Sequence, residues 1–469
     1  MENIILNTID TFIEKLSLKY NLQKDELIEL WEKGQNNHKW SEKNDEIKYF
    51  PEYYTTINDK LNTIHKQFST LTIEITKKLT KSEKKFFGIF ITPKVIIDKL
   101  NNSVIKHLGT NISKIKNILE PSCGTCEIVR YCDNIYTNVN IDAIEYNKKI
   151  YNAIKQLKFK NTVSIINADF IRYVCRTKYD LIIGNPPYFV LKKSEIPDEY
   201  EKFIYGRPNI FGLFILRSLS LLKPGGILAF VIPKSFLNSL YYSKIRNLIK
   251  DTCKIVKIED YSKLNDFIDT EQATFGLVIQ KNIFVGECKY SILFNNNYIF
   301  TDKSNELKKL FEGSTTLEKM KLKVRTGQIV WNKYKEKLTS DENSTILVYN
   351  SNITRHNKFV LKEFKNDEKE QYINIDGRFE PVLVVNRGNG NTTYKLNYAL
   401  IEKGPFVIEN HLNEIYSPRQ IGKDDLLNIY NKIMVSFKNP KTEKFIELFL
   451  GNNGLSKTEL ETIFPIYDI

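Results

Sequence analysis

Residues 180–190 constrain the fold of this chain more than any other stretch, because an expected buried strand runs there into a rigid turn. The apolar, β-branched run at residues 181–183 is typical of a strand inside a parallel sheet. The residues that follow end such a strand abruptly: Gly184, Asn185, Pro186 and Pro187. The pattern predicts a strand that leads into a functional loop.

The loop at residues 185–188 offers hydrogen-bond acceptors and one aromatic ring. Consecutive prolines fix φ and remove backbone donors, so the peptide around Asn185 and Pro186 presents carbonyl oxygens with little freedom to move. Asn185 adds a side-chain carbonyl, and Tyr188 adds a flat ring. A planar amino group on a heteroaromatic ring requires such a set, with two acceptors for its hydrogens and a ring to stack on. For the motif alone, a proline-rich turn without chemistry stays open.

Residues 115–120 predict an upstream strand that ends at Glu120. Pro121 and a turn through Gly124 lead from it into an expected helix. A strand, a tight glycine-containing turn and a helix form the nucleotide-binding unit of a doubly wound sheet. The glycine pattern of dinucleotide-binding proteins is absent here, so the sequence predicts a different nucleotide-like cofactor.

Two further expected strands also end near acidic residues. Residues 139–145 end at Glu145, where a carboxylate can bind ribose hydroxyls. Residues 163–170 end with Asp169, which can accept an adenine amine, and Phe170, which can stack on the ring. Each acid alone is more often a helix cap or a solvated turn, but their succession favours a cofactor site.

A further expected binding corner precedes these strands. Pro93 is expected at the start of a helix that Thr92 caps. Amides at a helix start favour a carboxylate, so this corner can hold the amino-acid end of a cofactor.

The composition indicates a polyanionic partner. The net charge of +13 and the pI near 9.1 favour nucleic acid, although a generally lysine-rich composition explains the charge equally well. No apolar run approaches the roughly 18 residues of a membrane span, and the N-terminus does not resemble a signal peptide. We therefore expect an intracellular protein with no membrane association.

The cysteines do not predict a disulfide framework or a metal site. The chain has 6 cysteines, and they are scattered. Cys123 and Cys126 have the spacing of half a zinc site, but no second pair or histidine follows at ligand distance. We expect both to be packing residues and expect no bound metal.

The residue pattern divides the chain into three parts. Residues 1–85 predict a helical N-terminal extension whose role is open. Residues 86–285 alternate between strand and helix patterns, as a doubly wound α/β domain does. Residues 286–469 follow as a separate C-terminal domain.

The ordered motifs resemble the γ-class, TaqI-like adenine-specific DNA methyltransferases of restriction-modification systems. The resemblance covers residues 86–469, and its motifs are Thr92-Pro93, Glu120 to Gly124, Glu145, Asp169-Phe170, and Asn185 to Tyr188. Placing the Thr-Pro element before the cofactor loop is the γ order. The resemblance implies an α/β fold with a Rossmann-like methyltransferase sheet, a helical N-terminal extension and a C-terminal mixed α/β target-recognition domain.

The resemblance also implies the chemistry. S-adenosyl-L-methionine would donate a methyl group to the N6 amine of an adenine that has left the stack of duplex DNA. The Asn185 side chain and the Pro186 carbonyl would accept the amine hydrogens, with Pro187 fixing the loop and Tyr188 stacking on the base. The enzyme would need no metal and could act as a monomer.

Two departures from the family pattern affect this expectation. Cys126 stands where the family usually has glycine in the cofactor loop. The aromatic residue that the family places on the flipped base is also displaced, because a gapless reading puts Ile279 there and the nearest ring is Phe275.

The C-terminal domain contains expected DNA contacts. Residues 324–337 interleave basic and aromatic side chains, among them Lys333 and Lys335. Arg387 follows an expected strand and lies in a glycine-rich loop. Basic groups neutralise phosphates, and arginine reads base edges in the major groove. Solvated loops of an ordinary β domain are the alternative.

Several alternatives stay open at this level. Another amino group, such as cytosine N4, an RNA base or a protein glutamine, would fit the same loop. A catalytically silent DNA-binding subunit is the alternative outside enzymes. A cognate restriction endonuclease is a possible partner, although an orphan or viral methyltransferase would have the same sequence features.

Overall fold

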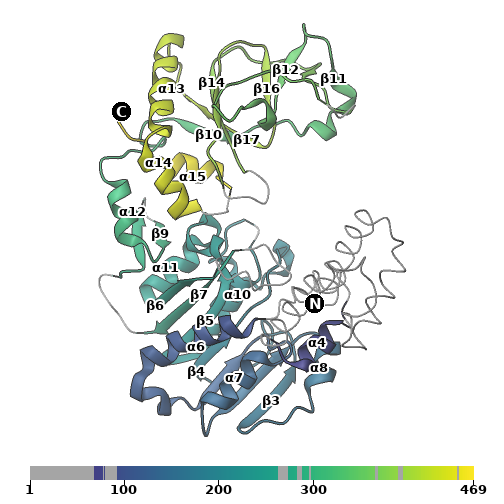
Figure 1. The fold of residues 1–469 in the computed structure, drawn as a ribbon, viewed down its shortest axis with the longest axis vertical. Helices are drawn as coiled ribbons and strands as arrows, with labels where there is room; N and C mark the ends of the chain where they lie inside the picture. The colour runs from purple at the N-terminus through teal and green to yellow at the C-terminus, as the bar shows by residue number, and fades with distance from the viewer. Residues whose placement is uncertain are drawn as a thin grey trace, which may run out of the picture. The chain divides into compact units, whose positions relative to one another are not determined.

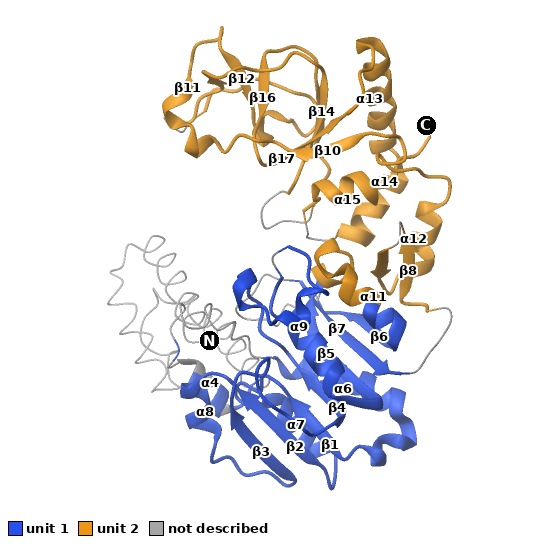
Figure 2. Ribbon diagram, turned by 180° about the vertical axis from the view of Figure 1, so that it is seen from behind, with its two compact units in different colours: residues 1–234, 248–286 blue, residues 235–247, 287–469 orange. Residues whose placement is uncertain are grey.

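The computed structural model describes residues 68–77, 79, 92–206, 208–261, 273–282, 288–294, 297–364, 368–388, 394–450 and 454–468. The chain forms two compact units, residues 1–234 with 248–286 and residues 235–247 with 287–469, which Figure 2 colours separately. The second unit thus includes residues 235–247, a segment expected within the first domain. Most of the expected N-terminal extension lies outside the described residues, apart from helix α4 (Thr70–Lys77) and its neighbours.

The first unit contains a seven-stranded sheet in the order β3-β2-β1-β4-β5-β7-β6. The pairs from β3 to β5 are parallel, while β7 runs antiparallel to both β5 and β6. The strands expected at residues 115–120, 139–145, 163–170 and 181–183 are present as β1 (Asn117–Glu120), β2 (Asn140–Glu145), β3 (Thr162–Asn167) and β4 (Tyr179–Gly184). The other strands of the sheet are β5 (Leu222–Pro233), β6 (Cys253–Asp260) and β7 (Thr274–Lys281). The expected Rossmann-like α/β fold is confirmed (Figure 1).

Helices cover both faces of this sheet because its central strands alternate apolar side chains on either side. Leu181 and Ile183 of β4 pack in a cluster with α6 and α7, while Ile182 between them points to the opposite face. Helix α10, which is apolar along its length, packs against β5 outside that cluster. The helices besides α4 are α6 (Lys94–Leu108), α7 (Glu127–Ile135), α8 (Lys148–Ile154), α9 (Asp198–Glu201), α10 (Phe211–Leu221) and α11 (Ser243–Thr252).

The second unit is a mixed α/β domain with two four-stranded sheets, ordered β10-β17-β14-β15 and β11-β13-β12-β16. On β14, Leu383 and Val385 pack among the helices, whereas Val382 and Val384 pack toward residues of the other sheet. Its strands are β8 (Ser291–Phe294), β9 (Asn297–Phe300), β10 (Lys323–Thr326), β11 (Leu338–Thr339), β12 (Thr345–Val348), β13 (Tyr372–Ile373), β14 (Val382–Asn386), β15 (Tyr398–Ile401), β16 (Phe406–Ile408) and β17 (Leu412–Tyr416). Its helices are α12 (Ser304–Phe311), α13 (Lys423–Phe437), α14 (Pro440–Phe445) and α15 (Lys457–Thr462).

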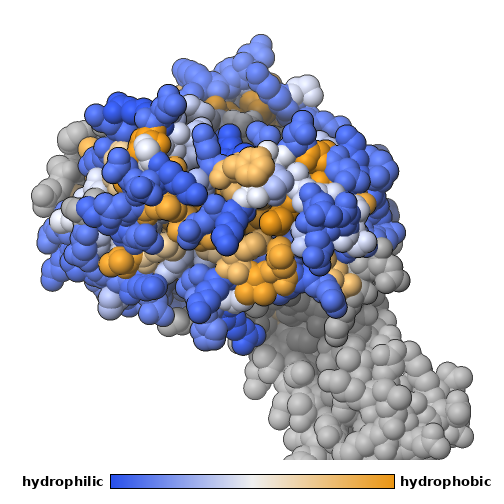
Figure 3. Space-filling model, turned by 90° about the horizontal axis from the view of Figure 1, so that it is seen from above, coloured by the Kyte–Doolittle hydropathy of each residue, from blue (hydrophilic) through white to orange (hydrophobic). Residues whose placement is uncertain are grey.

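Short helical turns connect these elements. The 3-10 turns are η2 (Gly109–Lys114), η3 (Lys193–Glu195), η4 (Lys234–Leu237), η5 (Leu240–Tyr242), η6 (Trp331–Lys333), η7 (Lys335–Lys337) and η8 (Asn350–Asn352), and η9 (Ile446–Leu450) is a π-helical turn. On the face drawn in Figure 3, hydrophilic residues surround smaller hydrophobic patches. In the part of the chain that the structure describes, no helix combines the length and apolar character needed to cross a membrane.

Candidate active site

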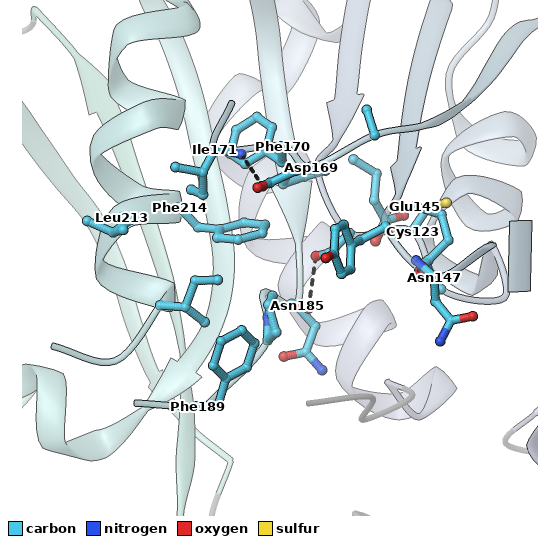
Figure 4. A pocket seen from close by; sticks show the side chains of 18 of the residues that line it. Cys123, Glu145, Asn147, Asp169, Phe170, Ile171, Asn185, Phe189, Leu213 and Phe214 are labelled. Atoms are coloured by element: carbon cyan, nitrogen blue, oxygen red, sulfur yellow. Dashed lines mark hydrogen bonds between the residues drawn. The ribbon is translucent and has the colours of Figure 1, made fainter. Parts of the chain in front are cut away.

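A cavity of about 700 Å³ lies at the carboxyl ends of β1, β2, β3 and β4 in the first unit. In the strand order, β1 stands between β2 and β4, which is the switch point where doubly wound sheets bind ligands. Most of the predicted site residues line this cavity: Thr92, Glu120, Pro121, Gly124, Glu145, Asp169, Phe170, Asn185 and Pro187. Figure 4 shows Asp169, Phe170 and Phe214 toward the upper left of the cavity and Glu145 and Asn147 toward the right. Asn185 and Phe189 lie below these residues in the same view.

Four predicted residues of the first unit do not line the cavity. Pro186 and Tyr188 belong to the loop after β4 but are not among the residues that line the cavity. Phe275 and Ile279 lie on β7 and are fully buried in the sheet, where they pair with Ile232 and Leu228 of β5. As residues that stack on a flipped base, they remain a prediction from the family pattern.

The turn after β1 contains two residues with left-handed backbone, Gly124 at φ 51° and Cys126 at φ 66°. Glycine adopts this conformation without strain, but a residue with a side chain does so at a cost. The thiol of Cys126 is fully buried in the core with Cys123, so both are packing residues, as expected. Among the described residues all the cysteines are free, and no three potential metal ligands gather.

Glu145 fixes this turn to the end of β2. Its Oε2 accepts a hydrogen bond from the Gly124 amide at 2.9 Å, and its Oε1 accepts one from the Asn147 amide at 2.6 Å. Burial raises the pKa of Glu145 to about 7, although both amide bonds favour the charged form. The carboxylate is therefore near its titration point at neutral pH, in a position to accept further hydroxyl donors.

Glu120 at the end of β1 is almost fully buried and faces the same cavity. Burial, together with nearby Cys126 and Glu145, raises its pKa well above the ordinary value. Its Oε2 has no hydrogen-bond partner among the described residues. A buried carboxyl with an unsatisfied oxygen favours a ligand that brings a donor or a positive charge.

Asp169 and Phe170 form the third side of the cavity. The Ile171 amide donates to Asp169 Oδ1 at 3.0 Å, and the Asp169 side chain remains 42% exposed, so it can accept a further donor. The Phe170 ring lies 4.9 Å from the Phe214 ring. The pair offers an apolar surface next to an acceptor, which suits a heteroaromatic ring with an amino group.

The loop after β4 is tied to the turn after β1. Ser122 Oγ donates to the main-chain oxygen of Asn185 at 3.1 Å. The Asn185 side chain also contacts Tyr188, whose hydroxyl donates to Oδ1 at 2.5 Å and lies 2.7 Å from the Val231 carbonyl oxygen. The Tyr188 ring packs edge-on against Phe211, and burial raises the pKa of its hydroxyl.

One local expectation was wrong. Helix α6 begins at Lys94, with Pro93 as its N-cap residue and no side-chain capping bond. Thr92 therefore does not cap the helix. Its side chain is buried and lines the cavity.

The predicted DNA contacts all lie in the second unit. Lys333 and Lys335 are exposed on η6 and η7, and Lys335 forms an ion pair with Glu368 at 2.5 Å. Arg387 is exposed after β14 and donates to the Asn410 carbonyl at 2.9 Å. All three side chains are exposed to solvent and are therefore accessible to a binding partner.

The sequence analysis missed several lining residues. Phe189 lines the cavity and directly follows the motif at residues 185–188, and this position in the chain was a usable signal. Asn147 and Phe214 come from the start of α8 and from α10. Phe214 was missed because most of α10 is apolar, with Phe211 and Phe214 both buried, so the pattern does not reveal which ring faces the cavity.

One family model and several known methyltransferases are similar to this chain. Residues 7–267 match the family model of the Eco57I restriction-modification methylase. The modification methylase CviBIII of Paramecium bursaria Chlorella virus NC1A is 28% identical over 408 residues, which cover 86% of this chain and 99% of the relative. The type II methyltransferase M.CvrRI of Paramecium bursaria Chlorella virus XZ-6E is 29% identical over 406 residues, which cover 86% of this chain and 100% of the relative.

The solved structures that are similar to this chain have lower sequence identity to it. A DrdV–DNA complex is 12% identical with a TM-score of 0.45, covering 80% of this chain and 54% of that chain. The type IIG restriction endonuclease BpuSI is 12% identical with a TM-score of 0.39, covering 81% of this chain and 59% of that chain.

Proposed function

This chain belongs to the Eco57I restriction-modification methylase family, and from that membership we propose that it methylates the N6 amine of an adenine in duplex DNA. The coarser activity follows from the family: the protein is a DNA methyltransferase of the restriction-modification type. Its methyl donor is S-adenosyl-L-methionine. The choice of base, the flipping of that base and the roles of single residues are our proposal.

The cavity fits this cofactor. Glu120 has an unsatisfied buried oxygen, which suits a positively charged group of the cofactor. Glu145 can accept ribose hydroxyls once it is ionised, and Asp169 with Phe170 can hold the adenine ring. Thr92 and Pro121 complete the wall. When bound, the cofactor supplies a methyl group that its sulfonium charge activates.

Asn185 is the residue that we place at the acceptor amine. Its side-chain oxygen and the Pro186 carbonyl would accept the amine hydrogens, which turns the nitrogen lone pair out of conjugation and toward the methyl group. The transfer is direct, so the chain contributes positioning and electrostatics without a covalent intermediate. The adenine must leave the DNA stack to reach this depth.

Phe189 is the aromatic residue of the loop that faces the cavity beside Asn185 (Figure 4). We propose that it contacts the flipped base from this position, while Tyr188, whose hydroxyl donates to Asn185, positions the acceptor side chain. Phe275 on β7 would have to leave a fully buried position to do the same.

One structural observation gives the strongest support to the proposal. The hydrogen bond from Ser122 Oγ to the Asn185 main-chain oxygen joins the turn after β1 to the loop after β4, and both line one cavity. The residue that would hold the amine is therefore fixed next to the residues that would hold the methyl donor. Enzymes gain much of their rate from holding reacting groups in this way.

The residue roles can be tested with Asn185→Ala. Turnover on DNA should fall by more than about 1000-fold, since a catalytic acceptor is lost, while S-adenosylmethionine affinity changes by less than about threefold. Asn117→Ala, at the opposite end of the sheet, is the control and should leave both unchanged. Substantial turnover by Asn185→Ala would remove Asn185 from the mechanism.

The proposed function also implies an oligomeric state for the protein. An enzyme that modifies one strand at a time needs one copy of its site, so we propose a monomer on duplex DNA. Sedimentation of the protein with and without DNA tests this state, and a stable dimer on one site would contradict it.

A further inference from the structure

The residues at the start of α4 contact the wall of the cofactor cavity from outside. The Ser69 amide and hydroxyl donate to Glu127 Oε1 at 3.2 and 2.5 Å. Thr72 Oγ1 lies 2.7 Å from Thr125 Oγ1 and also donates to Glu127 Oε1. Since each hydroxyl has one hydrogen, the consistent chain runs from Thr125 to Thr72 and from Thr72 to Glu127.

The contact between Thr72 and Thr125 is buried, and the contacts to Glu127 are partly buried. Thr72 is fully buried, and Thr125 is 2% exposed. Arg130 of α7 donates to Ser69 Oγ at 2.7 Å and lies 3.7 Å from Glu127 Oε1, which adds a charge to the cluster. Ile75 of α4 packs in the same core cluster as Cys126. The helix is therefore anchored to the domain by apolar packing, and its polar end is aimed at the cavity wall.

Thr125 and Glu127 line the cavity and are the two neighbours of Cys126 in the chain. Cys126 has φ 66°, a left-handed conformation that strains a residue with a side chain. Such backbone persists only where the surroundings hold it. The contacts from the start of α4 hold Thr125 and Glu127, the residues before and after Cys126.

We propose that Ser69 and Thr72 are positioning residues for S-adenosylmethionine: they hold residues 125–127 in the conformation that forms the cavity wall. This gives a function to the described end of the N-terminal extension. The inference rests on the use of this cofactor and is independent of adenine as the target base.

The test compares Thr72→Val, which removes the hydroxyl at nearly constant volume, with Thr72→Ser, which keeps it. Loss of a buried hydrogen bond of about 1.4 kcal/mol corresponds to tenfold weaker binding. We expect Thr72→Val to raise the cofactor Kd in calorimetry and its KM by about tenfold, with kcat at saturating cofactor and the KM for DNA unchanged. Thr72→Ser should stay within about twofold of the parent.

A purely structural role would give a different result. Thr72→Val would then lower the unfolding temperature and leave the cofactor KM unchanged, or it would change kcat and both KM values together. Either result overturns the inference. The failure of the proposed function, a product other than methyladenine, would leave this cofactor effect in place.

The strained residue provides a second variant. Glycine adopts the left-handed conformation without strain, so in a Cys126→Gly background Thr72→Val should weaken cofactor binding less than in the parent. The parent, the two single variants and the double variant are compared at a temperature below the unfolding temperature of the least stable of the four. Equal losses in the two backgrounds would show that α4 does not act by holding Cys126.

Discussion

The Tyr188 hydroxyl lies 2.5 Å from Oδ1 of Asn185, so the ring expected to stack on a substrate is bound to the side chain that we propose for catalysis. The same hydroxyl lies 2.7 Å from the Val231 carbonyl oxygen of β5. One hydroxyl hydrogen can serve only one of these acceptors at a time. Because burial raises the pKa of Tyr188, the hydroxyl stays protonated at neutral pH and can donate its hydrogen to Asn185 Oδ1.

Removal of this hydroxyl should affect catalysis more than cofactor binding. We expect Tyr188→Phe to lower kcat by about tenfold, since Asn185 loses about 1.4 kcal/mol of positioning, with the cofactor Kd unchanged. Tyr179→Phe is the matched control: Tyr179 is also buried, starts β4, and donates to Asp142 at 2.6 Å far from the cavity. It should lose stability and keep kcat. Equal kcat values for the two variants would contradict a positioning role for Tyr188.

Cofactor binding should weaken below neutral pH. The pKa of Glu145 is about 7, and only its ionised form can accept both ribose hydroxyls. Affinity measured by calorimetry should therefore be constant above pH 8 and fall by about tenfold per pH unit below pH 6. Glu145→Gln should bind weakly with little pH dependence between these values. A parent protein whose affinity does not change from pH 8 to pH 5.5 would contradict the role of Glu145.

The same group makes the ligand-free protein less stable as the pH rises. Burial raises the pKa of Glu145 from 4.5 to about 7, so the folded state binds a proton that the unfolded state has released. This contribution to stability is complete below pH 4.5 and is lost as the pH passes 7. In Glu145→Gln the corresponding slope of the unfolding free energy should be smaller.

Arg246 fixes residues 235–247 in the second unit. Its guanidinium is fully buried and donates to the carbonyl oxygens of Tyr298 at 2.6 Å, Ser239 at 2.7 Å and Phe236 at 2.9 Å. Lysine keeps the charge but cannot match this planar set of acceptors. Arg246→Lys should therefore lower the free energy of urea unfolding by about 3 kcal/mol. The exposed Arg355→Lys should change it by less than about 0.5 kcal/mol, and similar values for both would contradict the assigned role.

Lys333 and Lys335 allow a phosphate contact to be distinguished from a surface ion pair. Lys335 is paired with Glu368, while Lys333 has no carboxylate partner among the described residues. If the second unit binds the DNA backbone through Lys333, then Lys333→Ala should reduce the slope of log affinity against log salt by about 1. Lys335→Ala should reduce it less. Unchanged slopes for both variants would remove these lysines from the DNA interface.

The sequence predicted the sheet because its strands are short, apolar and bounded by clear turn residues. Glu120, Glu145 and Asp169 were found for a related reason: the carboxyl ends of parallel strands meet at one edge. Their positions in the chain therefore determine their positions in the cavity.

Contacts between distant segments could not be predicted in the same way. Ser69 and Glu127 are 58 residues apart, and nothing in the local pattern at either position indicates the contact. Similarly, Arg246 joins the second unit through carbonyl oxygens, which every residue carries. The sequence also did not indicate which ring lines the cavity: Phe189 lines it and Phe275 is buried, and this difference depends on packing.

The central claim is the identity of the methyl acceptor, and product analysis tests it most directly. The full-length protein is incubated with S-adenosylmethionine labelled in its methyl group and with separate pools of duplex DNA, RNA and protein, and the products are digested to monomers. We expect label in N6-methyldeoxyadenosine from the DNA pool and none from the Asn185→Ala variant. Label in methylcytosine, in RNA or in protein would contradict the assignment to adenine, and cofactor binding without any labelled product would contradict catalysis.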